Sequence, residues 1–296
     1  RTSVQSSIQR HFGLCTTPQQ TPSTSEEGIA SLMLDVYATF SQPLDHKTLY
    51  RWHSLLMTDK SIKDVGVYRT SSDLMRVISG PIHNPTIHFE APPSSNIPDE
   101  MSRFISWFNN TAPNGPHPLP GLTRASIAHL YFECIHPFED GNGRIGRALS
   151  EKILAQTLGQ PSLIALSVTI HAHRKAYYLA LEKANKKIDI TQWIVYFSQT
   201  ILQALDHTRT LIDFLIKKTK LFDGLTDLLN ERQKKVLLRM FKEGPAGFKG
   251  GLSAKNYIQI TQTSRATATR DLQELVDMGA LTQTGVLRYT RYYLNI

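Results

Sequence analysis

The chain has 296 residues, a formal net charge of +8 and 41% hydrophobic residues, which is typical of a folded globular protein. Because no run approaches the ~18 apolar residues that a membrane helix needs, we expect no membrane partner. The only two cysteines, Cys15 and Cys134, exclude a disulfide framework and favour a reducing, cytoplasmic location.

Residues 1–25 are polar and rich in Pro, Gln, Ser and Thr towards their end, which predicts a linker or an exposed loop. Since the chain starts at Arg1 rather than Met, we interpret this segment as the remnant of a truncated N-terminal region. From Glu26, apolar residues recur at helical spacing and predict a helix: Ile29, Leu32, Met33, Val36, Tyr37 and Phe40.

The next part of the chain mixes short helices with β-prone runs. A second helix is expected over residues 45–57. Short strands are expected at 67–69, 75–78 and 86–90, separated by Gly-Pro and Asn-Pro turns. Apolar spacing then predicts core helices around residues 101–108 and 127–134, with a Pro/Gly-rich loop between them.

Residues 134–147 carry most of the chemistry in the sequence. His136 is a base near neutral pH, and Asp140 is a hard oxygen ligand suited to Mg²⁺. Residues 141–143, Gly-Asn-Gly, can form an anion-binding nest where a helix would begin. Arg144 and Arg147 share one face of that helix. Each feature alone has an ordinary structural explanation, but the ordered set predicts a nucleoside triphosphate site.

Helices are also expected after this motif. Ile145, Leu149 and Ile153 step by four along one helix, which Gly159 to Pro161 ends. A further helix is expected over residues 173–185, and Thr191 begins a long one that continues past Leu205.

The string His-Pro-Phe-x-Asp-Gly-Asn-Gly-Arg-x-x-Arg at residues 136–147 resembles the signature of the Fic-domain family. The resemblance implies that His136 is the catalytic base and that Phe138 anchors the loop. It also implies that Asp140 holds Mg²⁺ and that Arg144 and Arg147 clamp the terminal phosphates. The nucleotide-binding set that it implies in this stretch is Asp140, Gly141, Asn142, Gly143, Arg144, Ile145, Gly146 and Arg147.

The resemblance to Fic proteins runs from about Val4 to about Lys220 and implies further roles. A hairpin flap for docking the target is expected at Ile87, His88, Phe89 and Glu90, although an edge hairpin without a role is the alternative. Tyr177, Tyr178 and Asn185 are expected near the adenine and ribose, although the tyrosines could simply be core residues.

Residues 23–28 match the Ser/Thr-x-x-x-Glu-Gly pattern of the inhibitory helix of Fic proteins. However, the segment that starts at Val4 looks like one that follows this helix in relatives with an extra N-terminal domain. We therefore expect Glu27 to be an ordinary acid in the first turn of a helix and the inhibitory helix to lie upstream of Arg1.

The tail, residues 225–296, resembles a winged helix-turn-helix domain, with three helices and two strands that flank Gly285. Residues 230–296 contain eleven Lys or Arg against five Asp or Glu, so most of the positive charge lies here. The resemblance implies contacts with double-stranded DNA, for which the candidates are Ser264, Arg265, Thr267, Arg270, Arg288 and Arg291. A dimerisation or partner-binding module is the alternative.

The expected fold is therefore mainly α: a Fic helical bundle with a small β-hairpin flap over residues 26–220, plus a winged-helix (α+β) domain. The expected function is protein adenylyltransferase, a nucleotidyltransferase that moves AMP from Mg·ATP to a Ser, Thr or Tyr hydroxyl of a target protein. A kinase-like relative is the alternative within the fold. The rival from another class is a DNA-binding regulator whose Fic domain senses nucleotide. A homodimer is compatible with either function.

Overall fold

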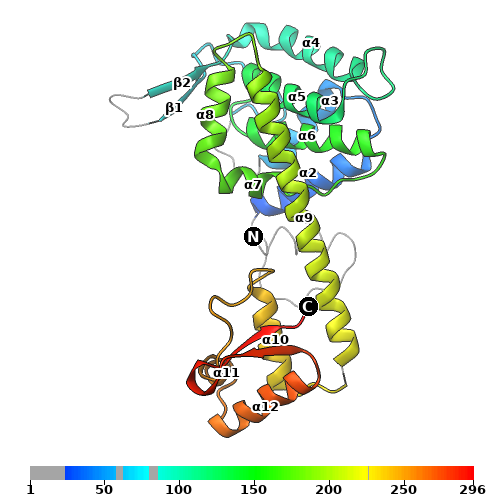
Figure 1. Cartoon of the computed structure of the whole chain (residues 1–296). Coiled ribbons are helices and arrows are strands. Elements are labelled where there is room, and N and C mark those ends of the chain that lie inside the picture. The colour runs from blue at the N-terminus through cyan, green and yellow to red at the C-terminus, as the bar shows by residue number, and fades with distance from the viewer. Residues whose placement is uncertain (1–23, 58–62, 80–85, 226) are drawn as a thin grey trace. The chain divides into compact units, whose positions relative to one another are not determined.

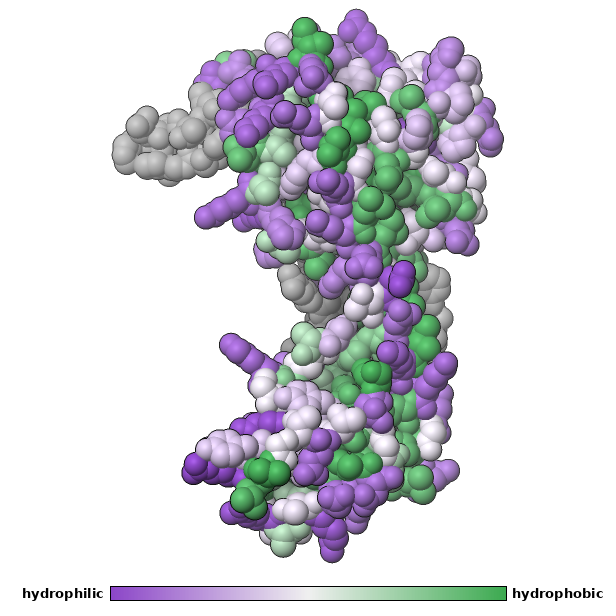
Figure 2. All heavy atoms as spheres, viewed as in Figure 1, coloured by the Kyte–Doolittle hydropathy of each residue, from purple (hydrophilic) through white to green (hydrophobic). Residues whose placement is uncertain are grey.

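The computed structural model describes residues 24–57, 63–79, 86–225 and 227–296 (Figure 1). The chain divides into two compact units, residues 1–205 and residues 206–296. No helix in the described ranges is both long enough and apolar enough to cross a membrane. The surface viewed in Figure 2 exposes hydrophobic side chains interspersed with hydrophilic ones.

The first unit is a bundle of helices around one hydrophobic core. Its helices are α2 (Thr24–Ala38), α3 (His46–Leu56), α4 (Ile97–Asn110), α5 (Gly121–Ile135), α6 (Asn142–Leu158), α7 (Leu166–Ala172), α8 (Arg174–Ala184) and the first part of α9 (Thr191–Leu225). Large side chains fill the core, among them Trp52, Phe104, Phe132, Phe138 and Trp193. Helices α5 and α6 lie against each other in this core, so the loop that joins them is supported on both sides.

A small antiparallel hairpin precedes α4. Strand β1 (Arg76–Ser79) pairs with β2 (Thr86–Glu90), with Arg76 opposite Glu90 and Ser79 opposite Thr86. The register shifts between Val77 and Ile78, which marks a bulge. The sheet has two strands, and Figure 1 shows it projecting away from the helices of its unit.

The second unit contains the last part of α9, three further helices and a hairpin. These are α10 (Glu231–Lys242), α11 (Ala254–Thr261), α12 (Arg265–Asp277), β3 (Leu281–Thr284) and β4 (Arg291–Leu294), with β3 antiparallel to β4. Asp271, which is 1% exposed, accepts hydrogen bonds from Arg232, Asn230 and Tyr257. This buried carboxylate therefore joins the three helices through polar contacts inside an otherwise apolar core.

Most of the predicted elements are confirmed, with differences at their ends. Helix α3 is bounded by Asp45 and Met57, the limits expected for it, and the strands expected near 75–78 and 86–90 are present. The strand predicted at 67–69 is wrong: the Arg69 N–H donates to the Pro137 carbonyl instead of to a neighbouring strand (2.9 Å). The short helix α7 was not predicted. The segment 1–23 lies outside the described residues.

Candidate functional site

The loop between α5 and α6 contains two backbone positions that turn the chain sharply. His136 caps the C-terminus of α5 in the left-handed region, with φ 50° and ψ 59°. Gly141 caps the N-terminus of α6 at φ 84°, a conformation that glycine adopts without steric cost. The six-residue loop therefore joins the negative end of one helix to the positive end of the next.

Asn142 and Phe138 hold this loop in shape. The Asn142 side chain accepts from the Phe138 N–H (3.0 Å) and donates to the Phe138 carbonyl (2.7 Å). The Phe138 ring is fully buried and stacks on the His53 ring, with ring centroids 4.2 Å apart. The sequence correctly indicated that Phe138 is an anchor. The Asn142 side chain is thus bonded within the loop, and the expected contact of residues 141–143 with phosphates through their backbone N–H groups stays a prediction.

His53 is a second support that the sequence did not reveal. Its Nδ1 accepts from the Gly66 N–H (2.9 Å), so its Nε2 carries the proton and donates to the Asp140 carbonyl (3.2 Å). Burial lowers the pKa of His53 and keeps it in this neutral form. No motif marks His53, because it comes from α3, more than eighty residues earlier in the chain.

The His136 imidazole is oriented for use as a base. Its Nδ1 lies 3.3 Å from the Glu133 carbonyl, which can only accept, so we assign the proton to Nδ1 and a free lone pair to Nε2. Burial is the largest influence and lowers the pKa of His136, and the nearby Arg69 charge acts in the same direction. The Glu133 carbonyl and Asp140 oppose this shift without reversing it.

Charged groups surround the N-terminus of α6. Asp140 accepts from the Gly141 N–H (2.6 Å) and from Arg144 Nη2 (2.8 Å), and its side chain is 64% exposed. Arg147 donates from Nε to the Ser167 hydroxyl of α7 (3.0 Å). The structure thus brings together Asp140, Arg144, Arg147 and the first N–H groups of α6, the arrangement that the motif predicts.

The Asp140 carboxylate also suits a metal ion that binds together with substrate phosphates. In the described ranges, no three His, Cys, Asp or Glu side chains cluster so as to hold a metal ion. Mg²⁺ is usually bound by one or two carboxylates together with substrate phosphates and water, so a single exposed Asp140 fits it. Arg144 would then have to give up one Asp140 oxygen.

A buried polar pair lies beneath this site. Glu133 and His129 are one turn apart on α5 and both approach Gly146 of α6. A Cβ atom at Gly146 would lie 2.9 Å from Glu133 Oε1 and 3.1 Å from His129 Nδ1. Burial raises the pKa of Glu133 to about 7 and lowers that of His129 to about 3. Gly146 therefore allows the close contact of two helices, a role that its place in the motif does not indicate.

The remaining nucleotide candidates are placed differently from one another. Ile145 is fully buried in the core, and Tyr177 is 4% exposed with its hydroxyl 2.8 Å from His129 Nε2. Tyr178 is 48% exposed and lies under the Arg174 guanidinium. Asn185 accepts from the Cys134 thiol (3.0 Å), which places it beside the end of α5. Only Tyr178 and Asn185 thus keep a side chain outside the core.

The four flap candidates all lie on β2. Ile87 is opposite Ile78 of β1, Phe89 is opposite Val77, and Glu90 forms an ion pair with Arg76 (2.8 Å). Because the sheet has only two strands, β2 pairs with a neighbour on one side only within the described residues. The other side has backbone groups suited to pairing with an extended peptide.

Of the six tail candidates, Ser264 is the N-cap of α12 and Thr267 lies in its first turn. The Ser264 hydroxyl caps the helix by accepting from the Thr267 N–H (3.2 Å), whereas Arg265 and Arg270 are exposed on the same helix. Arg288 lies between β3 and β4, and Arg291 is the first residue of β4. The Arg291 guanidinium donates to the carbonyls of Thr290 and Arg288 (2.8 and 3.3 Å).

Glu27 lies in the first turn of α2 and is half-buried. The adjacent Gly28 is buried where α2 crosses α3, and a Cβ atom there would collide with the Leu55 carbonyl oxygen. Helix packing therefore explains Gly28 without any inhibitory role.

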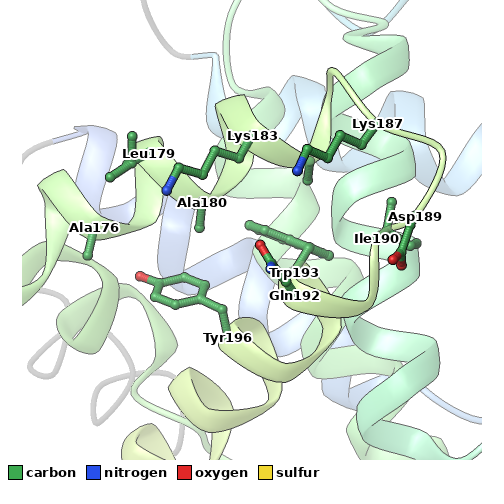
Figure 3. A pocket seen from close by; sticks show the side chains of 11 residues that line it. Ala176, Leu179, Ala180, Lys183, Lys187, Asp189, Ile190, Gln192, Trp193 and Tyr196 are labelled. Atoms are coloured by element: carbon green, nitrogen blue, oxygen red, sulfur yellow. The ribbon is translucent and has the colours of Figure 1, made fainter.

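A separate hollow of about 250 Å³ lies between α8 and the start of α9 (Figure 3). Figure 3 shows Lys183, Trp193 and Tyr196 among the side chains around it. His136, Asp140 and Arg147 do not line this hollow. The open loop between α5 and α6, rather than this hollow, therefore holds the reactive groups.

Comparisons with known proteins match part of this chain to one family. Residues 43–154 match the Fic/DOC family. The chain is 33% identical over 106 residues to the protein adenylyltransferase Fic of Drosophila mojavensis, which covers 36% of this chain and 19% of the relative. It is 31% identical over 98 residues to an Aquifex aeolicus protein described as a probable protein adenylyltransferase, covering 33% of this chain and 27% of that one. The chain thus matches about a fifth to a quarter of the length of these relatives.

Solved structures show the same fold. A Fic family protein from Desulfovibrio desulfuricans has a TM-score of 0.52 and 21% identity, covering 99% of this chain and 80% of its own. A Fic domain containing signaling protein from Bacteroides thetaiotaomicron has a TM-score of 0.52 and 19% identity, covering 68% and 77%. The architecture is therefore a mainly α-helical Fic fold with a small C-terminal β-hairpin. The winged-helix assignment of the tail stays a prediction.

Proposed function

Taking the Fic/DOC match of residues 43–154 as the premise, we propose that the chain is a protein adenylyltransferase that uses Mg·ATP. Relatives that match about a third of the chain are described as a protein adenylyltransferase and a probable protein adenylyltransferase. The observation that carries the proposal is the orientation of the His136 imidazole. Its Nδ1 is paired with the Glu133 carbonyl (3.3 Å), which leaves Nε2 as an acceptor. A protein that only senses nucleotide does not need an oriented base.

In the proposed reaction, a Ser, Thr or Tyr hydroxyl of the target protein transfers its proton to Nε2 of His136. The hydroxyl oxygen forms a bond to the α-phosphorus of ATP, and the bond from that phosphorus to the pyrophosphate oxygen breaks. Pyrophosphate leaves and AMP stays on the target. In-line positioning and charge neutralisation supply most of the acceleration in phosphoryl transfer.

The other residues of the loop would bind and orient the nucleotide. The N–H groups at the start of α6 and the guanidinium groups of Arg144 and Arg147 supply donors and positive charge for the phosphates. Asp140 would hold Mg²⁺, which neutralises charge on the triphosphate when it is bound. Tyr178 and Asn185 are the candidates for contacts to the base and ribose, and β2 is the candidate for docking the target chain.

His136→Ala tests the proposal. AMP transfer from labelled ATP to proteins of a cell lysate should fall by roughly 10²–10⁴-fold, the usual cost of losing a general base. The affinity for ATP, measured by calorimetry, should change little. His207→Ala is the matched control, because His207 is exposed and lies in the other unit. Transfer within a few-fold of wild type in His136→Ala would remove the assignment.

A second function, binding of double-stranded DNA, is proposed for residues 206–296. It is supported by one arrangement: Arg265 and Arg270 are exposed on α12, which follows α11 after a turn with Gln262 in the left-handed region (φ 55°). A helix that begins in this way after a short turn is the part of a helix-turn-helix that reads a DNA groove.

A further inference from the structure

Arg69 is a buried cation beside His136 that no motif marks. Arg69 is 3% exposed and lies in the irregular segment between α3 and β1. Its backbone N–H donates to the Pro137 carbonyl (2.9 Å), and its Nε donates to the His136 carbonyl (2.9 Å). Two successive carbonyl groups of the catalytic loop are therefore held by one residue.

The same guanidinium also holds the base of the hairpin. Its Nη2 donates to the Pro92 carbonyl (2.5 Å), two residues after β2 ends at Glu90. The Ala91 N–H donates to the Met75 carbonyl (2.9 Å) and joins the two strands at this end. Arg69 thus connects the hairpin to the His136–Pro137 peptide through a single rigid group.

This connection acts on a strained position. A residue other than glycine is disfavoured in the left-handed region, because its Cβ atom approaches the following carbonyl oxygen, and His136 adopts φ 50°. Arg69 donates a hydrogen bond to the carbonyl of His136, and Nδ1 of the His136 ring is paired with the Glu133 carbonyl. The backbone and the ring of His136 are therefore fixed separately, which sets the direction of Nε2.

Burial of a guanidinium is costly unless its donors are well paired. The described partners of the Arg69 side chain are carbonyl oxygens, one of them at the negative C-terminal end of α5. A lysine has one compact ammonium group and cannot reproduce the planar fork that spans His136 and Pro92. The geometry therefore requires an arginine and not merely a positive charge.

We propose that Arg69 is a positioning residue that fixes the His136 imidazole and the β1–β2 hairpin relative to each other, so that a target hydroxyl aligned on β2 meets Nε2 of His136. The inference rests on the function proposed above, because it assigns the hairpin and His136 to one reaction. It goes beyond that function by naming the residue that connects target docking to the base.

The test compares Arg69→Gln and Arg69→Lys with Arg124→Lys in the full chain. Arg124 is the matched control, because it is fully buried and also donates to a backbone carbonyl, that of Phe108 (2.6 Å). It lies eleven residues before the end of α5, away from His136. Three readouts are needed: thermal unfolding, NMR titration of the His136 ring assigned with His136→Gln, and AMP transfer from labelled ATP.

The charged groups that face the His136 ring are Arg69 from the segment before β1 and Asp140 from its own loop. Removing the Arg69 charge should therefore raise the pKa of His136 in Arg69→Gln. Transfer should fall at least tenfold in Arg69→Gln and in Arg69→Lys, with ATP affinity within about twofold of wild type. Arg124→Lys should be destabilised while its His136 pKa and its transfer rate stay unchanged.

An unchanged His136 titration in Arg69→Gln, with transfer reduced no more than in Arg124→Lys, would show that Arg69 only stabilises the fold and would overturn the proposal. If Arg69→Gln does not fold, Arg69→Lys decides: transfer equal to that of Arg124→Lys overturns the proposal, and a selective loss supports it. If wild type itself transfers no AMP, the proposed function fails. The NMR comparison then still decides whether Arg69 sets the His136 ring.

Discussion

The side chain of Asn142 is bonded at both of its polar atoms to the backbone of Phe138, and the residue is 2% exposed. The central polar residue of the motif thus gives the loop its shape rather than offering its amide to a ligand. The nucleotide-binding role of Asn142 is therefore indirect: it keeps the first N–H groups of α6 aimed outwards, where an anion would lie.

Asn142→Ala should lower both stability and nucleotide affinity. It leaves two buried backbone groups of Phe138 without partners, at a cost of about 2–4 kcal/mol of unfolding free energy, and ATP binding should weaken at least tenfold. Asn109→Ala is the matched control, because Asn109 forms the same pair of bonds with Leu44 (2.8 and 2.9 Å). It should lose stability without losing ATP affinity. Urea unfolding and calorimetry distinguish the two variants.

The pH dependence of AMP transfer should reflect the environment of His136. Burial and Arg69 lower its pKa below the usual 6.5, so more than half of the rings are neutral and able to accept a proton at pH 6.5. The transfer rate should therefore fall to half of its plateau value only below pH 6.5. Burial raises the pKa of Glu133 to about 7, so this carboxyl could titrate in the same range. The pH profile is therefore measured in Glu133→Gln. A rate that already halves above pH 6.5 in that variant would contradict the assignment of His136 as the base.

At the scale of secondary-structure elements, the packing of α5 on α6 depends on Gly146. His129 cannot move away from an added Cβ atom, because its ring stacks on Phe197 (4.5 Å between centroids) and its Nε2 bonds the Tyr177 hydroxyl. Glu133 can shift only within a buried site. The two helices therefore have no room for a larger residue at this crossing.

Gly146→Ala should destabilise the protein by about 1–3 kcal/mol, because overpacking outweighs the gain of about 1 kcal/mol in helix propensity. Gly224→Ala on α9 is the matched control, since a Cβ atom there meets nothing within 4 Å. That substitution should stabilise the protein by about 0.5–1 kcal/mol. The change in unfolding free energy is measured for both variants, and the two changes should have opposite signs. Stabilisation by Gly146→Ala as well as by Gly224→Ala would show that the contact at Gly146 is not tight.

The sequence was informative where spacing alone decides structure. Helix α2 follows from apolar periodicity, and the loop anchor Phe138 follows from the motif. The failures involve contacts between distant segments. Arg69 was expected in a strand, but its N–H and side chain bond residues 92, 136 and 137, and no local pattern encodes those partners. His53 was hidden for the same reason, because its role depends on Gly66 and Asp140.

Across the whole molecule, the positive charge is uneven. Residues 230–296 account for a net charge of +6 out of the formal +8 of the chain, and both arginines of α12 are exposed. Arg265 and Arg270 lie in the N-terminal half of a helix that follows a short turn, where the phosphates of duplex DNA would attract exposed guanidinium groups. The match to the Fic/DOC family covers residues 43–154 and does not extend into this part of the chain.

If the tail binds duplex DNA, the affinity of the full chain should fall steeply between ~50 and ~200 mM salt, because each phosphate contact releases counterions. Arg265→Ala should lower the preference for one base pair by ~1–3 kcal/mol, whereas Arg288→Ala should weaken all sequences alike. Arg239→Ala is the control, since Arg239 lies on α10 and is paired with Glu243. Gel shifts with randomised duplexes at low salt provide the measurement. The absence of any shifted band would exclude DNA, and the tail would then be a module that binds protein, such as the target of AMP transfer.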